Sequence, residues 1–165
     1  ETVDGLHTAR VVDLDEGVVR ELTRDEVGLG YRHSALGPRA VVGAASFTGR
    51  PDAPGACAQR IDEIVRWRRA HQPGGQNAGS VFTNPAGDAA GRLIEASGLK
   101  GLRVGGAVVS EKHANFFVAE PSAHADDVYA LIREVQRRVE TETGVRLEPE
   151  LRLVGFSHTE EEVGR

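Results

Sequence analysis

The sequence has no methionine, a single cysteine and few aromatic residues, which make up 5% of its 165 residues. The lone Cys57 cannot form an internal disulfide, and no cysteine and histidine spacing resembles that of a structural zinc site. We therefore expect neither a disulfide framework nor a bound metal, and nothing indicates secretion. The chain opens on a charged, strand-like stretch at 1–4, and because it contains no methionine we expect its natural start to lie upstream.

Long apolar runs are absent as well, and so is an excess of positive charge. No segment reaches the roughly 18 apolar residues of a membrane span, and none has the charged-then-apolar plan of a signal peptide. The net charge of -5, from 25 acidic and 20 basic residues, creates no broad positive field for nucleic acid or anionic lipid. Arg66, Arg68 and Arg69 form one basic cluster, which a helix that displays them to solvent explains. We expect a cytoplasmic protein without nucleic-acid or membrane partners.

The residues that are present are typical of a globular protein. Hydrophobic residues make up 39% of the sequence and charged residues 27%, a balance found in chains that fold. The length suits one core, or one domain plus the remnant of a neighbour. Strand-like and helix-like periodicities mix without strict alternation, so we expect an α+β fold.

The expected elements follow from this periodicity and from capping and turn residues. They are a hairpin of strands at 11–14 and 18–22, a capped turn from Thr23 to Glu26, a buried strand at 40–47, a linker at 48–55, helices at 56–70, 89–97 and 126–143, a loop after the first of these helices, strands at 102–109, 115–119, 145–147 and 151–156, and a polar tail at 157–165.

The segment Asn77-Ala-Gly-Ser-Val-Phe-Thr-Asn-Pro85 is the most informative stretch for chemistry. Small residues on both sides of Ser80 let the backbone approach a ligand closely and leave the hydroxyl unshielded. By itself the segment also fits a glycine-rich turn that leads into a strand. No G-x-S-x-G motif is present and the nearest histidine in sequence is His71, which disfavours a serine hydrolase.

Two further segments carry groups suited to an anionic ligand. In Leu147-Glu-Pro-Glu150, the proline fixes its own φ and biases Glu148 toward an extended conformation, so the two carboxylates diverge and Glu150 is free to face inward. A solvated strand entrance explains this segment equally well. In Gly30-Tyr-Arg-His-Ser34, Arg32 presents a planar fork that matches a carboxylate or phosphate, although a surface arginine is the simpler interpretation.

Two other features do not support a specific role by themselves. His113 fits either a catalytic group or a packed side chain, and we favour packing. Gly105-Gly106 is too short to be a nucleotide-binding fingerprint.

Taken together and in order, these segments resemble the UDP-N-acetylenolpyruvoylglucosamine reductases (UDP-N-acetylmuramate dehydrogenases) of cell-wall synthesis. The matching pieces are 30–34, 77–85, 91–95, 98–102, 105–110, 113–116 and 147–151. Each piece alone is a weak signal, but their order and spacing cover nearly the whole chain from about 11 to 156. The resemblance implies an FAD- and NADPH-dependent oxidoreductase of peptidoglycan synthesis, with the roles in cell shape and division that this synthesis has.

The resemblance also implies which residues act. The family's active-site positions fall on Arg32, Ser80 and Glu150. NADPH reduces bound FAD, and the flavin then passes hydride to the enolpyruvyl ether of a UDP-sugar. Arg32 and Glu150 would stabilise the negative charge that develops beside the substrate carboxylate, and Ser80 would donate a proton to the carbanion. Tyr31 and Asn84 are implied as substrate contacts, although structural roles suit them equally.

The sequence departs from the family pattern in two ways. It lacks a tyrosine-bearing insertion, as in the compact branch of the family, and it lacks the N-terminal flavin-binding region. We therefore expect 1–47 to be the C-terminal remnant of an FAD-binding domain and 56–156 to be a substrate-binding domain, with little activity or FAD binding in this chain alone. A non-catalytic UDP-sugar-binding module is the main alternative. A different flavin oxidase is disfavoured because it leaves the serine and Glu-Pro-Glu motifs unexplained, and the oligomeric state is not indicated.

Overall fold

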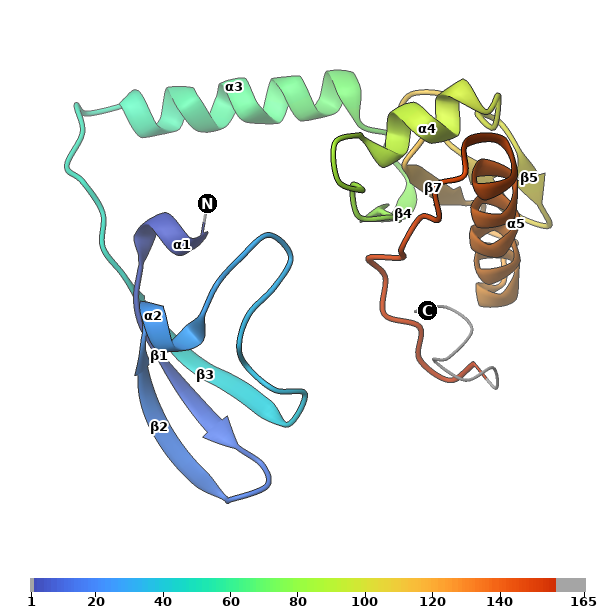
Figure 1. The fold of residues 1–165 in the computed structure, drawn as a ribbon. Helices are drawn as coiled ribbons and strands as arrows, with labels where there is room; N and C mark the ends of the chain where they lie inside the picture. Colours follow the sequence, from blue (N-terminus) through green and yellow to red (C-terminus); the bar gives the residue numbers. More distant parts are fainter. Residues whose placement is uncertain (1, 157–165) are drawn as a thin grey trace. The chain divides into compact units, whose positions relative to one another are not determined.

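The computed structural model describes residues 2–156, so the polar tail expected at 157–165 lies outside the described residues. The chain divides into two compact units, Glu1–Cys57 and Ala58–Arg165. Figure 1 shows the helices and antiparallel strands of each unit. This mixture confirms the α+β fold class.

The first unit is a three-stranded antiparallel sheet with two short helical turns. Its elements are α1 (Thr2–Gly5), β1 (Leu6–Asp13), β2 (Val18–Thr23), α2 (Arg24–Val27) and β3 (Ala40–Phe47). The strand order is β2-β1-β3, so β1, the longer strand of the hairpin, lies in the centre. The strand-like start was a wrong prediction, since Thr2–Gly5 forms a helical turn.

Local side chains explain the hairpin and the turn that follows it. The Asp13 carboxylate accepts hydrogen bonds from the amides of Asp15 and Glu16 in the loop, and Gly17 has a φ of 67°. At the start of α2, the Glu26 carboxylate accepts from the Thr23 amide at 2.7 Å, and the Thr23 hydroxyl accepts from the Glu26 amide. The hairpin and the capping box are therefore confirmed.

The sheet of the first unit buries only one of its faces. Ala9 and Val11 are buried on that face. Val12 pairs with Val19 on one side and with Val41 on the other, so the three form a row on the opposite face, and Val19 and Val41 are exposed within this unit. The strand at 40–47 was predicted at the correct residues but its burial was wrong, because an apolar run does not reveal whether a neighbour covers it.

The second unit combines a four-stranded antiparallel sheet with three helices, and the three helices were expected. Its elements are α3 (Ala56–His71, which begins at the unit boundary), β4 (Gln76–Ser80), α4 (Ala90–Ala96), β5 (Arg103–Val104), β6 (Ala107–Val109), β7 (Phe116–Ala119) and α5 (Ala125–Thr143). The strand order is β4-β7-β6-β5. Within the described part of the chain, no helix has both the length and the apolar character that crossing a membrane requires.

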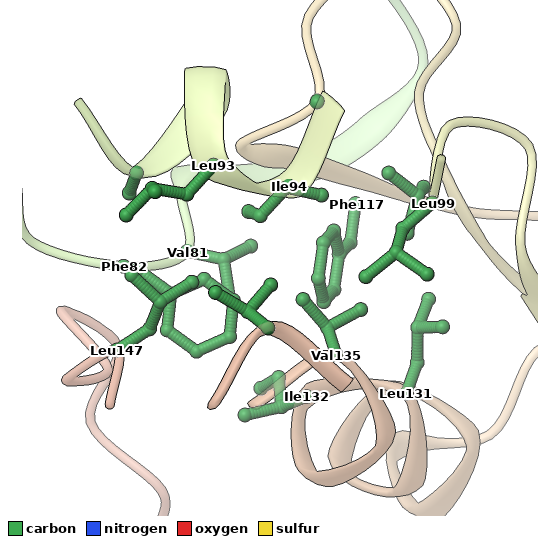
Figure 2. Close-up of a cluster of buried hydrophobic side chains, with 14 of the residues drawn as sticks. Val81, Phe82, Leu93, Ile94, Leu99, Phe117, Leu131, Ile132, Val135 and Leu147 are labelled. Atoms are coloured by element: carbon green, nitrogen blue, oxygen red, sulfur yellow. The ribbon is translucent and has the colours of Figure 1, made fainter. Parts of the chain in front are cut away.

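The core of the second unit lies between α4, α5 and the sheet (Figure 2). Leu93 and Ile94 on α4 pack with Leu131, Ile132 and Val135 on α5. Gly144 ends α5 in the left-handed conformation, as its position predicted. The apolar residues of α3 differ from those of α4 and α5, because no side chain of α3 is buried.

Three predictions about strands in this unit were wrong. The strand expected at 102–109 is two short strands, β5 and β6, joined by a turn at Gly105-Gly106. A Cβ on Gly106 would lie 2.6 Å from the Cα of Ala123, and the Asp127 carboxylate accepts a hydrogen bond from the Gly106 amide at 3.1 Å. The glycine pair therefore brings a tight turn against the start of α5.

The strands expected at 145–147 and 151–156 do not form. In their place, a single bridge joins Phe82 to Pro149. Proline has no amide hydrogen, so it cannot donate to a longer ladder at this point.

Candidate functional site

Ser80 is the last residue of β4, where sequence reasoning expected a loop. It pairs with Phe116 of β7 and is half-buried. The preceding Gly79 has a φ of 82°, a conformation that favours glycine, and its amide donates to the Asn77 side chain at 3.0 Å. The small residues around Ser80 therefore allow an irregular strand end that presents a hydroxyl.

Glu150 lies on the segment that runs beside the residues after Ser80. The Glu150 amide donates to the Val81 carbonyl at 2.8 Å, and the Thr83 amide donates to the Glu148 carbonyl at 2.9 Å. Glu148 is exposed and Glu150 is half-buried, so the two carboxylates differ in their surroundings. Of the predicted site residues, the backbone brings Ser80 and Glu150 together through Val81.

Asn115 holds the other side of the same segment, and sequence reasoning gave it no role. Its main-chain oxygen accepts from the Val81 amide at 2.8 Å. Its side chain accepts from the Phe82 amide at 2.9 Å and donates to the Phe82 carbonyl at 2.8 Å. The signal that would have found it is an asparagine within the apolar run Ala114-Asn-Phe-Phe117, because a polar group buried there must have partners.

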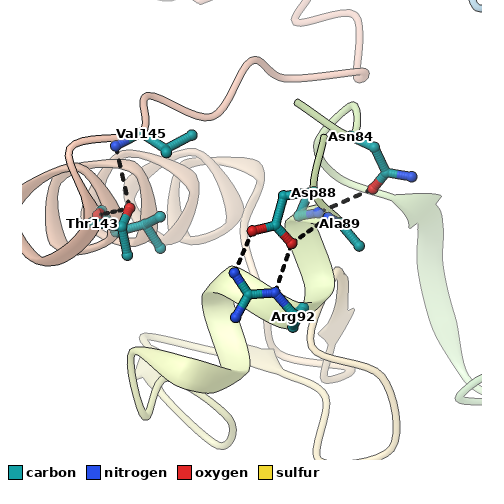
Figure 3. Close-up of polar contacts among 8 residues, drawn as sticks. Asn84, Asp88, Ala89, Arg92, Thr143 and Val145 are labelled. Atoms are coloured by element: carbon teal, nitrogen blue, oxygen red, sulfur yellow. Dashed lines mark hydrogen bonds and ion pairs between the residues drawn. The ribbon is translucent and has the colours of Figure 1, made fainter. Parts of the chain in front are cut away.

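Asn84 contributes to the start of α4. Its side-chain oxygen accepts from the Ala90 amide at 3.0 Å (Figure 3). Beside it, the Arg92 guanidinium forms an ion pair with Asp88, and this contact, with the Ala89 amide, lowers the pKa of Asp88 to about 2. Asn84 therefore has a structural role here, and its substrate contact stays a prediction.

Tyr31 and Arg32 belong to the first unit, in a turn closed by a bridge between Gly30 and His33. Arg32 has a φ of 53°, and no other described non-glycine residue has a positive φ. Its guanidinium carbon lies 5.9 Å from the centre of the exposed Tyr31 ring. Residues with strained backbones gather at functional sites, so this φ marks Arg32 as a candidate functional residue.

A basic cavity of about 380 Å³ lies at the end of α3. Arg68, Arg69 and Gln72 line it, together with Lys112 from the loop before β7. The Lys112 ammonium donates to the Arg69 carbonyl at 2.7 Å. Sequence reasoning treated these arginines as a solvated helix face and assigned Lys112 no role, because only the fold brings the lysine to the helix.

His113 is a packed side chain, as favoured from the sequence. Its ring packs edge-on against the Phe116 ring, with 4.8 Å between the ring centroids, and its Nδ1 accepts from the Asn115 amide at 3.2 Å. Within residues 2–156, no group of three or more histidine, cysteine, aspartate or glutamate side chains is arranged to hold a metal ion.

Comparisons with known proteins agree with these motifs. The family model for the C-terminal domain of UDP-N-acetylenolpyruvoylglucosamine reductase matches residues 71–154, just over half of the chain. The reductase of Syntrophotalea carbinolica is 49% identical over 132 residues, which are 79% of this chain and 44% of that protein. The reductase of Sphingopyxis alaskensis is 44% identical over 145 residues, which are 87% of this chain and 48% of that protein.

A solved structure extends the similarity to the fold. The crystal structure of UDP-N-acetylenolpyruvylglucosamine reductase from Thermus caldophilus matches with a TM-score of 0.79 and 38% identity, over 92% of this chain and 54% of that one. The chain thus spans about half the length of the relatives it matches. On the family model, the sequence identities and the shared fold, the chain belongs to the UDP-N-acetylenolpyruvoylglucosamine reductase family.

Proposed function

We propose that this chain supplies the substrate-reducing residues of a cytoplasmic reductase that converts UDP-N-acetylglucosamine enolpyruvate to UDP-N-acetylmuramate, with FAD and NADPH, in peptidoglycan synthesis. Residues 56–156 form the substrate-binding domain, and residues 1–47 are the end of the flavin-binding domain. The exposed valine row on the sheet of the first unit supports the second assignment, because a complete domain covers such apolar surface. In isolation the chain has little activity.

The cavities described in the first unit are small for a ligand the size of FAD. Two cavities there have volumes of about 210 and 300 Å³, at or below the lower end of pockets for drug-sized ligands. We therefore assign the flavin, which supplies the hydride in this chemistry, mainly to the part of the relatives that this chain does not span.

The chain's own residues act on the substrate. Arg32 holds the substrate carboxylate and stabilises the charge that develops beside it. Glu150 shares that task as a neutral carboxylic acid, whose O–H donates a hydrogen bond to the developing anion. Ser80 donates its hydroxyl proton to the carbon next to the carboxylate, a transfer that is downhill because a carbanion is a much stronger base than an alkoxide. Tyr31 and Asn84 contact the substrate.

The diphosphate of the UDP portion offers a second anionic group for the protein to bind. A diphosphate carries negative charge that guanidinium and ammonium groups recognise. The basic cavity formed by Arg68, Arg69 and Lys112 suits such a group, and it lies in the same unit as Ser80.

The observation that carries the proposal is the link from Ser80 through Val81 to Glu150. The residue directly after the proton donor accepts a hydrogen bond from the amide of the residue that carries the carboxyl group, although the two segments lie about 70 residues apart in sequence. A structural strand end does not require a serine and a half-buried glutamate at these two positions.

A chimera that joins the N-terminal half of the Syntrophotalea carbinolica reductase to this chain tests the proposal. We expect a yellow protein that oxidises NADPH only when the enolpyruvyl sugar is present. Ser80→Ala should slow substrate reduction by about 10² to 10⁴-fold and leave flavin reduction by NADPH nearly unchanged, as measured by stopped-flow absorbance. Ser122→Ala, at an exposed serine of the same unit, is the matched control.

Equal losses in both half-reactions would contradict the proton-donor role. The alternative, a non-catalytic UDP-sugar-binding module, predicts a different pattern. Calorimetric titration of the unmodified chain would then show tight binding of the UDP-sugar, while the chimera would show no NADPH oxidation that depends on the sugar.

A further inference from the structure

The Asn115 side chain uses both of its polar groups on a single residue. It is 4% exposed and lies directly before β7. Its Oδ1 accepts from the Phe82 amide at 2.9 Å, and its Nδ2 donates to the Phe82 carbonyl at 2.8 Å. A primary amide offers a donor and an acceptor, as a peptide group does. This side chain therefore hydrogen-bonds to Phe82 as the backbone of a neighbouring strand would.

The side-chain hydrogen bonds of Asn115 begin where the regular pairing of β4 with β7 ends. β4 pairs with β7 as far as Ser80 and Phe116. The Val81 amide then donates to the Asn115 main-chain oxygen at 2.8 Å, and the Asn115 side chain takes the next residue. The chain is thereby held by hydrogen bonds for two residues past Ser80.

The opposite edge of this segment holds Glu150. Its amide donates to the Val81 carbonyl at 2.8 Å. One continuous set of hydrogen bonds therefore runs from Asn115 through Val81 and Phe82 to Glu150. A leucine at position 115 would fill the same buried space but would leave the Phe82 amide and carbonyl without partners, which is costly in a buried segment.

We infer that Asn115 is a positioning residue, which sets the placement of the Ser80 hydroxyl relative to the Glu150 carboxyl by holding Val81 and Phe82 from the other side. It acts through the backbone and does not touch the substrate. The inference rests on the proposed function for the chemical roles of Ser80 and Glu150. We expect a large effect of Asn115 on the rate of substrate reduction, because reacting groups misplaced by about 1 Å lose about 10²-fold in rate.

Hydrogen exchange on the unmodified chain tests the structural part. In Asn115→Leu, the Phe82 amide should exchange at least about tenfold faster, because its acceptor is gone. The Val109 amide, which donates to the Leu102 carbonyl, should keep its rate. Unchanged protection of Phe82 would overturn the inference.

Kinetics of the chimera test the functional part. Asn115→Leu should slow substrate reduction by about 10- to 100-fold, with flavin reduction and the KM for the sugar nearly unchanged. The double variant with Ser80→Ala should be no slower than Ser80→Ala alone, since a misplaced donor and a missing donor are the same loss. If Asn115→Leu does not fold, Asn115→Asp, which keeps the acceptor for the Phe82 amide but removes the donor to the Phe82 carbonyl, gives the kinetic comparison.

Val139→Ala is the control for general destabilisation. Val139 is fully buried on α5, and its truncation should leave both half-reactions within about twofold at temperatures well below melting. If Ser80→Ala has no effect on substrate reduction, the proposed function fails. If Ser80→Ala is slow while Asn115→Leu behaves like Val139→Ala, or if the two losses add in full, only the positioning role fails.

Discussion

The two units of the chain differ in how they hold their motifs. Among the described residues, the core of the first unit contains four buried hydrophobic residues and that of the second contains fifteen. Arg32 is held in the first unit by a strained turn. Ser80 and Glu150 are held in the second by backbone pairing against a packed core. Motifs that are equally easy to recognise in the sequence can therefore be held by hydrophobic cores of very different size.

The largest expected effect is the loss of a core side chain from the second unit. Ile132→Ala should lower its free energy of unfolding by about 4 kcal/mol, because this α5 side chain is fully buried in the core of the unit. Leu6→Ala in the small core of the first unit should lower that unit's free energy of unfolding by about 2 kcal/mol, since fewer neighbours surround the side chain. Urea unfolding followed by NMR signals from each unit measures both. Equal losses would break the comparison.

The next effect concerns the close contact between Gly106 and Ala123 in the second unit. In Gly106→Ala the new Cβ would meet the Ala123 backbone at 2.6 Å, so the turn between β5 and β6 must move away from α5. We expect a loss of about 3 kcal/mol, read from thermal melting. Gly37→Ala in the first unit is the control, because nothing lies within 4 Å of its added Cβ. A melting temperature unchanged in Gly106→Ala would show that this turn adapts freely.

A smaller effect tests the strain in the first unit. Arg32→Ala and Arg32→Gly both remove the guanidinium, but only glycine adopts a φ of 53° without strain. Arg32→Gly should therefore be more stable than Arg32→Ala by about 1 kcal/mol, measured by chemical denaturation. Both variants should abolish substrate reduction in the chimera. Equal stability of the two would mean that the turn stores no strain.

The smallest effect is electrostatic and lies on α5. Hydrogen bonds from Arg137, and then from Arg138, lower the pKa of Glu134 to about 2 from an ordinary value of 4.5. A depressed carboxyl pKa contributes stability above the unfolded value, and this contribution is lost as the pH falls from about 4.5 through about 2. Because the pair is partly solvated, Glu134→Gln should lower the melting temperature at pH 7 by only about 2 °C.

The pH profile supplies the check. The difference between Glu134→Gln and the unmodified chain should shrink as the pH falls below about 4.5 and become small at about pH 2. Glu142→Gln, at an exposed glutamate of the same helix, is the control. A difference that persists unchanged at pH 2 would exclude the ion pair as its source.

Local signals in the sequence predicted much of the fold. The hairpin, the Thr23 and Glu26 capping box and the three longer helices follow from turn residues, caps and periodicity, which act over a few neighbouring residues. The failures share one cause. The turn at Gly105-Gly106 and the missing strands after Gly144 depend on which segments lie side by side, which no local pattern specifies.

The candidate site divides in the same way. The motifs around Arg32, Ser80 and Glu150 can be recognised in the sequence because each needs particular residue types in a short stretch. The roles of Asn115 and Lys112 were missed because their partners, Phe82 and Arg69, lie 33 and 43 positions away.

The sequence by itself determined the family, the residue types available for the chemistry and the local elements that carry them, since all of these depend on the order of neighbouring residues. Only the tertiary structure decided that Val81 and Phe82 are held from both sides, by Asn115 and by Glu150. The physical reason is that a buried backbone segment must satisfy its amides and carbonyls, and it does so with whichever groups the packed core brings beside it.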